Sequence, residues 1–131
     1  MQKVYLAGGM KSEWREKIKR ECKEFTFFCP KDKEVSYAMI IEEYGTWDLH
    51  YIKQADIIFC YMEKTNPSGI GLACEMGFAY GIGKTVILVL ETENEHIEER
   101  YLDFLRKVSH VTFSNFLDGI KYLKSFYLKP N

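Results

Sequence analysis

Two uninterrupted apolar runs constrain the fold of this chain more than any other feature of its sequence. Residues 57–61 read Ile-Ile-Phe-Cys-Tyr and residues 85–90 read Thr-Val-Ile-Leu-Val-Leu. A strand with one face in water alternates apolar and polar side chains, whereas a strand covered by helices on both faces is apolar throughout. The two runs therefore predict central strands of a parallel sheet.

The other segments favour an α/β fold in which strands alternate with amphipathic helices. Further strands are expected at residues 3–7, 25–29 and 111–113, and helices at residues 12–23, 46–54, 71–80, 96–107 and 116–126. Residues 30–45 give no clear pattern. A chain of 131 residues is long enough to bury one core, so we expect a single domain over residues 1–131.

Composition argues against several classes of protein. The chain has 18 Lys and Arg against 19 Asp and Glu, so a polymeric nucleic acid is not an expected partner. The sequence shows neither an apolar stretch of about 20 residues nor a secretory signal, so we expect no membrane association and a cytoplasmic location. Four cysteines without a Cys-x-x-Cys pair predict reduced, mostly buried thiols, and we expect neither a metal nor a cofactor.

The predicted helix after the strand at residues 57–61 carries one charge, on Glu75. A helix that is apolar on nearly all sides is expected to be buried, where an ionised carboxylate is costly unless it is paired or faces a cleft. Gly71, Gly77 and Gly81 weaken this helix and predict that backbone or ligand packs closely against it. Glu75 is therefore a candidate functional group; the alternative is a glutamate that caps the helix start or emerges at the surface.

A second carboxylate and a glycine turn are expected at the same edge of the sheet as Glu75. Helical spacing turns Asp48 toward the sheet, near the start of its predicted helix. Gly8 and Gly9 follow the first strand, and ligands of such sheets bind beyond the strand carboxyl ends, where the strand order reverses. An ordinary first-turn aspartate is the alternative for Asp48.

Three further polar side chains need an interpretation. Two of them could be functional or structural, and the third is expected to be structural. Tyr5, on the first strand, could hold Glu75 in place or belong to the core. Ser68 could donate to a phosphate or a sugar, or act as an ordinary helix cap. For Asp56, which precedes a strand, we expect a role in a turn.

Three blocks of sequence carry a resemblance to a known family. They are Val-Tyr-Leu-Ala-Gly-Gly-Met at residues 4–10, Asp48 followed eight residues later by Asp56, and Gly-Leu-Ala-Cys-Glu-Met-Gly-Phe-Ala at residues 71–79, leading to residues 83–87. With these blocks the chain resembles the nucleoside 2-deoxyribosyltransferase superfamily, which includes the deoxynucleoside 5′-monophosphate N-glycosidases. The resemblance implies a flavodoxin-like (Rossmann-like) three-layer sandwich with a five-stranded parallel sheet.

The resemblance also implies a reaction and a set of site residues. Glu75 would attack the sugar and form a covalent glycosyl-enzyme, Tyr5 would orient Glu75, and Asp48 would serve proton transfer. The partners would be a small nucleoside or nucleotide, a nucleobase, and further copies of the chain in a dimer or larger homo-oligomer. We expect substrate contacts from Gly8, Gly9, Met10, Ser68, Gly69 and Gly71.

Three functions stay open at this point. Transferases of the superfamily often carry an acidic residue six positions before the nucleophile, and here that position is Gly69. The preceding Ser68 is similar to the serine of the phosphate-binding loop in the monophosphate hydrolases, displaced by one residue. We therefore expect deoxyribosyl transfer between bases, with hydrolysis of a 5′-monophosphate as the alternative. Candidate phosphate ligands for that alternative are Lys11, Ser12 and Arg15, which could equally form the solvated start of an amphipathic helix. A nucleotide-binding domain without turnover is the third possibility.

Overall fold

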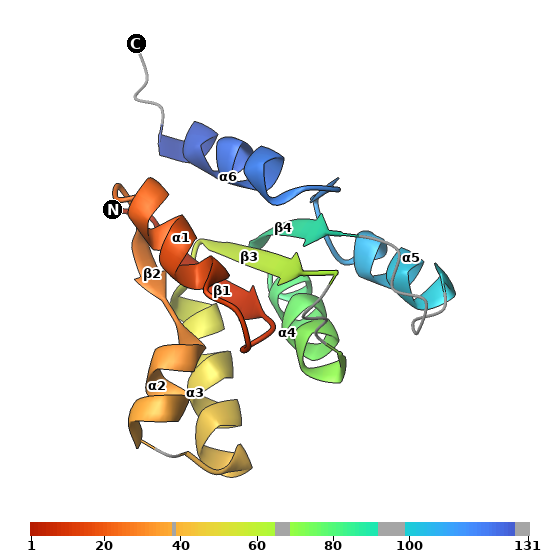
Figure 1. Ribbon diagram of the computed structural model, residues 1–131. Coiled ribbons are helices and arrows are strands. Elements are labelled where there is room, and N and C mark those ends of the chain that lie inside the picture. The colour runs from red at the N-terminus through yellow and green to blue at the C-terminus, as the bar shows by residue number, and fades with distance from the viewer. Residues whose placement is uncertain (38, 65–68, 92–98, 128–131) are drawn as a thin grey trace.

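A five-stranded parallel sheet forms the middle layer of the protein (Figure 1). The computed structural model describes residues 1–37, 39–64, 69–91 and 99–127. The strand order is β2-β1-β3-β4-β5, and every neighbouring pair is parallel. Both predicted central strands have a neighbour on each side, as expected. The strands are β1 (Lys3–Gly8), β2 (Thr26–Phe28), β3 (Ile57–Met62), β4 (Thr85–Leu90) and β5 (Val111–Phe113).

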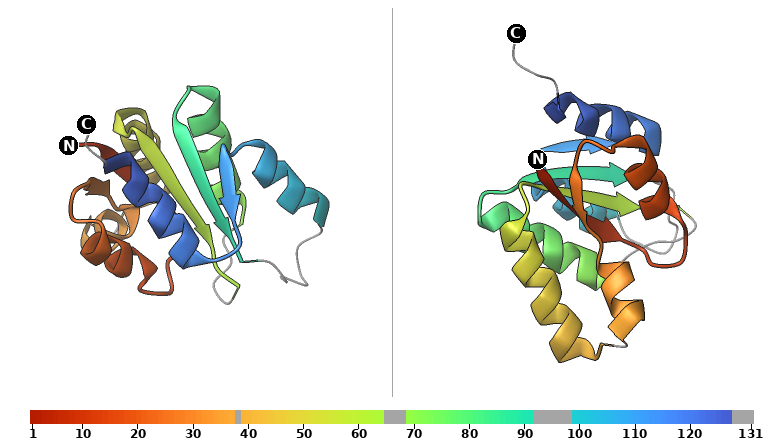
Figure 2. Two further views of the ribbon diagram at one scale, coloured as in Figure 1. Left: turned by 90° about the horizontal axis from the view of Figure 1, so that it is seen from above. Right: turned by 90° about the vertical axis from the view of Figure 1, so that its left-hand side faces the viewer.

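Helices cover both faces of this sheet, which confirms the three-layer α/β fold (Figure 2). One core cluster joins α1 and α6 to one face, and a second joins α3, α4 and α5 to the other. The helices are α1 (Trp14–Glu21), α2 (Pro30–Tyr37), α3 (Ile41–Gln54), α4 (Ile70–Gly81), α5 (Glu99–Lys107) and α6 (Phe116–Lys124), and a short 3-10 turn (Ser125–Tyr127) follows α6.

The alternation of side chains along β1 decides which face receives its tyrosine. Val4 and Leu6 belong to the core beneath α1 and α6, whereas Tyr5 and Ala7 belong to the core beneath α3, α4 and α5. Successive side chains of a strand point to opposite faces, so this division follows from the backbone alone. Tyr5 thus lies on the face covered by α3 and α4, the helices that carry Asp48 and Glu75.

The segment that gave no clear pattern is largely helical. Pro30 begins α2, where its fixed φ angle and missing N–H are well tolerated. α3 begins at Ile41, five residues before the predicted start, and the Glu43 carboxylate accepts a hydrogen bond from the Ile40 N–H at 3.0 Å. The predicted helix at residues 96–107 corresponds to α5, and residues 96–98 lie outside the described residues.

The outer side of α4 differs from the expectation of a buried helix. Its buried side chains are Leu72, Met76 and Ala79. A Cβ atom added at any of the three glycines of the prediction would meet nothing within 4 Å. The expectation that backbone packs closely against them is therefore wrong for the described chain, and close approach of a ligand stays a prediction for Gly71, which lines a cavity.

Two other expectations concern thiols and membranes. All four cysteines are free thiols, with Cys22, Cys29 and Cys60 buried and Cys74 exposed, as predicted. Within the described ranges, no helix combines the length and the apolar character required to cross a membrane.

Candidate active site

A cavity of about 500 Å³ lies beyond the carboxyl end of β1, between α3 and α4. β1 stands between β2 and β3, so the strand order reverses at this point of the sheet, which is where doubly wound sheets bind their ligands. The cavity is lined by Gly8, Gly9, Met10, Met39, Tyr44, Asp48, Gly69, Gly71, Leu72 and Glu75.

Glu75 lies in the second turn of α4 and lines this cavity. Its side chain is half-buried, and its Oε2 atom is shielded from solvent. Its negative charge reaches the sheet, because it adds to the effect of burial in raising the pKa of the Cys60 thiol on β3. Glu75 is therefore neither a cap of its own helix nor a surface glutamate pointing into open solvent.

Asp48 lies in the middle of α3 rather than near its start, because the helix begins at Ile41. The alternative of a first-turn aspartate is thereby excluded. Its side chain is half-buried, its Oδ1 atom is shielded from solvent, and it lines the same cavity as Glu75. Two carboxyl groups from two different helices thus share one cavity.

Tyr5 is fully buried beneath these carboxyl groups. Burial raises the pKa of its hydroxyl, and the negative charges of Glu75 and Asp48 and a hydrogen bond to Glu75 raise it further, against a smaller opposing effect of the Arg15 charge. The hydroxyl therefore stays protonated and can donate. Its contact with Glu75 is looser than a short hydrogen bond, as catalytic contacts often are before substrate binds.

The cavity contains most of the predicted substrate-binding residues and three that were not predicted. Gly8, Gly9, Met10, Gly69 and Gly71 line it, whereas Ser68 lies outside the described residues. The additional lining residues are Met39, Tyr44 and Leu72.

One of these additional residues had a signal in the sequence. Tyr44 precedes Asp48 by four residues, which is one helical turn, so both lie on one face of α3. This signal was missed because the helix was expected to begin after Tyr44.

The remaining polar candidates lie elsewhere. The Asp56 carboxylate accepts a hydrogen bond from the Lys3 N–H at 2.8 Å, so Asp56 has the expected turn role. Of the three candidate phosphate ligands, Lys11 is exposed, Ser12 donates to Glu63, and Arg15 is buried behind the end of β1. Among the residues that the structure describes, no three His, Cys, Asp or Glu side chains gather as a metal site would require.

Comparisons with known proteins place this geometry in a family. The family model described as nucleoside 2-deoxyribosyltransferase like matches residues 1–93. A search of curated proteins finds no match.

Two solved structures share the fold. A conserved protein from Enterococcus faecalis V583 superposes with a TM-score of 0.71 at 18% identity, covering 96% of this chain and 99% of that chain. The CMP N-glycosidase BcmB from Clostridium botulinum superposes with a TM-score of 0.60 at 22% identity, covering 97% of this chain and 100% of that chain. Since the family model matches well over half of its residues, the chain belongs to the nucleoside 2-deoxyribosyltransferase-like family.

Proposed function

We propose that this protein cleaves the N-glycosidic bond of a 2′-deoxynucleoside and transfers the deoxyribosyl group to another nucleobase. The observation that carries the proposal is the meeting of Glu75, Asp48 and Tyr5 around one cavity. Paired carboxyl groups beside a sugar-sized cavity are the machinery of retaining glycosidases, in which one attacks the anomeric carbon and the other serves proton transfer.

The reaction proceeds in two displacements. In the first, a Glu75 carboxylate oxygen attacks C1′, the bond from C1′ to the base nitrogen breaks, and the departing base takes the electron pair and a proton. In the second, a nitrogen of another base attacks C1′, gives its proton to the Asp48 carboxylate, and releases Glu75 as the carboxylate. Two inversions at C1′ retain the β configuration, and water in place of the second base gives hydrolysis.

The neighbours of Glu75 divide the remaining tasks. Tyr5, protonated because it is buried, donates toward the Glu75 carboxylate and orients it. Asp48 is the second carboxyl group of the same cavity, and a retaining mechanism requires such a partner as proton donor beside the attacking carboxylate. Asp48 is then the group that protonates the departing base.

The charge of the cavity lining favours a neutral sugar over a phosphorylated one. The described lining residues include two carboxylates and neither lysine nor arginine. A 5′-phosphate would add about two negative charges to that surface. We therefore place deoxynucleosides first among the substrates.

Hydrolysis of a nucleoside 5′-monophosphate is the second candidate, and one position favours it. Lys11 is exposed and directly follows Met10, which lines the cavity. The CMP N-glycosidase with the same fold is, by its name, an enzyme of a nucleoside monophosphate.

One assay separates these candidates. The protein is incubated with deoxyadenosine plus cytosine and, separately, with dCMP and CMP, and the products are resolved by liquid chromatography. Deoxycytidine formation supports transfer, and free cytosine from a monophosphate supports hydrolysis. Glu75→Gln should abolish either activity, whereas Glu21→Gln, at an exposed glutamate at the end of α1, should leave it unchanged. Full turnover by Glu75→Gln, or the absence of any product with the native chain, would overturn the proposal.

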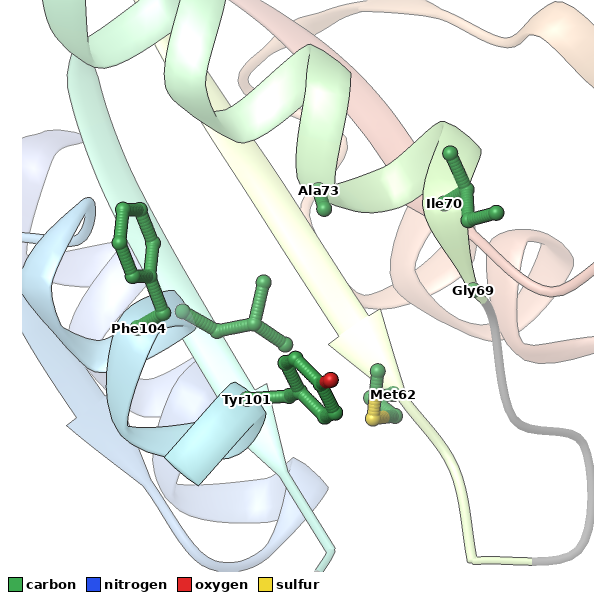
Figure 3. Close-up of a pocket in the computed structure, with 7 residues that line it drawn as sticks. Met62, Gly69, Ile70, Ala73, Tyr101 and Phe104 are labelled. Atoms are coloured by element: carbon green, nitrogen blue, oxygen red, sulfur yellow. The ribbon is translucent and has the colours of Figure 1, made fainter. Parts of the chain in front are cut away.

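We further propose that the enzyme acts as a homo-oligomer, with the face formed by α4 and α5 as its interface. An apolar groove of about 330 Å³ separates these helices (Figure 3), lined by Met62, Gly69, Ile70, Ala73, Tyr101, Phe104 and Leu105. Three of these side chains are exposed: Ile70 by 84%, Phe104 by 71% and Tyr101 by 59%.

A second copy of the chain fits this face better than a charged partner. The residues that line the groove carry no charge, and the one charge of α4, on Glu75, belongs to the cavity on the other side of the helix. Identical apolar patches complement each other across a twofold axis. Gly69 lines both the groove and the catalytic cavity, so the interface would adjoin the site.

Light scattering coupled to size-exclusion chromatography tests this interface. Phe104→Glu should convert the assembly to monomers, whereas Leu117→Glu, at an exposed leucine of α6, should not. A native chain that is monomeric at assay concentrations, or an assembly unaffected by Phe104→Glu, would refute the interface.

A further inference from the structure

Arg15 is the fully buried charged residue of the described chain, with 1% of its surface exposed. Burying a guanidinium group is unfavourable unless its donors are satisfied by well-placed acceptors. Sequence reasoning placed this side chain among the candidate ligands of a phosphate. Its burial shows that it performs another task.

The guanidinium group binds the backbone where β1 ends. Nη1 donates to the Gly9 carbonyl at 2.7 Å, Nη2 to the Gly8 carbonyl at 3.0 Å, and Nε and Nη2 each to the Leu6 carbonyl at 3.4 Å. The Trp14 indole N–H donates to the same Gly9 carbonyl at 3.0 Å. The Trp14 ring also lies against the guanidinium, 4.5 Å from its central carbon.

The backbone held in this way is one wall of the catalytic cavity. Gly8 and Gly9 line the cavity, whereas Arg15 and Trp14 are not among its lining residues. The turn is tightly confined, because Gly8 has φ of +154° and a Cβ atom there would overlap the Tyr61 carbonyl and approach the Trp14 ring to 2.9 Å. Arg15 therefore supports the wall from behind.

The geometry of the peptide bond relates the carbonyl groups held by Arg15 to the N–H groups that could contact the substrate. In a planar trans peptide the carbonyl and the following N–H point in opposite directions. With the Gly8 and Gly9 carbonyls directed at Arg15, the N–H groups of Gly9 and Met10 are directed away from Arg15. Gly8, Gly9 and Met10 line the cavity and Arg15 does not.

We propose that Arg15 is a positioning residue, which fixes the Gly8–Gly9 turn so that the N–H groups of Gly9 and Met10 bind an oxygen of the sugar. Only an arginine has the planar array of donors that can hold three carbonyl groups at once; a lysine ammonium is a compact charge on a flexible stem. The catalytic consequence rests on the proposed function, whereas the structural one does not.

The structural consequence is tested by a measurement that does not depend on enzymatic activity. In Arg15→Lys, the hydrogen exchange of the Trp14 indole N–H, measured by NMR, should accelerate at least tenfold, because its acceptor Gly9 is no longer held. The indole of Trp47, on α3, serves as an internal reference and should be unchanged. Arg106→Lys, at an arginine of α5 that pairs with Glu99 and Asp103, should change neither.

The catalytic consequence is read from the kinetic constants. Because the turn binds the sugar in the ground state, Arg15→Lys should raise KM about tenfold and change kcat less than threefold. Trp14→Phe, which removes one of the two side chains that hold the Gly9 carbonyl, should raise KM by a smaller factor.

The two readouts distinguish failure of this inference from failure of the proposed function. If the native chain shows no glycosidic cleavage, the proposed function fails, and the Trp14 exchange still decides whether Arg15 holds the turn. Unchanged Trp14 exchange in Arg15→Lys overturns the positioning role. The positioning role is also overturned if the activity of Arg15→Lys falls only in proportion to its fraction of folded protein while KM stays unchanged.

Discussion

At the scale of single residues, the two carboxylates of the cavity differ in their surroundings, and the tasks proposed for them rest on this difference. Glu75 and Asp48 are chemically similar, and both are half-buried in one cavity. They differ in their neighbour, since the buried Tyr5 hydroxyl makes its hydrogen-bonding contact with Glu75. An oriented carboxylate suits attack on carbon, and the second one is left for proton transfer.

The proton-transfer role of Asp48 predicts a leaving-group effect. Asp48→Asn should lower kcat by about 10²-fold for a nucleoside whose base must be protonated as it departs. The loss should be much smaller for 7-methyl-2′-deoxyguanosine, because its cationic base departs without a proton. Initial rates with both substrates measure the difference, and equal losses would contradict an acid role for Asp48.

The buried tyrosine predicts a pH dependence of stability. The pKa of Tyr5 is raised in the folded protein, so the unfolded chain releases this proton first, near pH 10, and folding loses stability above that pH. Tyr5→Phe removes the effect and should flatten the alkaline limb of the stability profile. Thermal unfolding of the native chain and of the variant between pH 8 and pH 11 checks this. The pKa of Tyr61 is also raised in the folded protein, so the stability profile of Tyr61→Phe is measured for comparison with that of Tyr5→Phe.

At the scale of elements, the apolar runs were sufficient to predict strands, and weakly patterned helices were not. β4 has the predicted bounds, because a strand covered on both faces has no polar position to blur its limits. The edge strand β5 also has the predicted bounds, although its Thr112 is exposed. α2 and the first turn of α3 were missed, because their charged residues show no apolar stripe at helical spacing. Because of that omission, Asp48 was predicted near the start of its helix rather than in the middle, and Tyr44 was not recognised as a residue on the same helix face.

Replacing glycine by alanine is expected to have opposite effects on stability in α6 and in α3. A Cβ atom at Gly119 of α6 would overlap the Val89 side chain and lie 3.2 Å from the Phe59 ring, so Gly119→Ala should destabilise the fold by about 1–3 kcal/mol. Gly45→Ala in α3 meets open space and should stabilise the fold by up to about 1 kcal/mol. Chemical denaturation of both variants measures the two signs, and a stabilising Gly119→Ala would show that α6 is loosely packed.

At the scale of the whole molecule, the fold brings distant segments to one edge. Tyr5 comes from β1, Asp48 from α3 and Glu75 from α4, and the reversal of strand order between β1 and β3 places both helices on the face to which Tyr5 points. The same arrangement leaves the outer side of α4 uncovered within the described chain.

Self-association through the uncovered face predicts a stability that depends on concentration. Binding of a second folded copy stabilises the folded state by mass action, so Tm should rise with protein concentration. In Phe104→Glu the Tm should be independent of concentration. Thermal unfolding over a hundredfold range of concentration checks this, and a native Tm that stays constant would contradict the interface.

The sequence by itself determined the sheet and the family, and it singled out the residues that we propose as reacting groups. A lone charge in an apolar, glycine-containing helix singled out Glu75, and continuous apolar runs defined the central strands. The tertiary structure decided what depends on contacts between distant residues: the open outer side of α4, the additional cavity wall from Met39 and Tyr44, and the task of Arg15. A sequence records which side chains are present and their local period, whereas the partner of a buried charge is fixed only when the chain is folded.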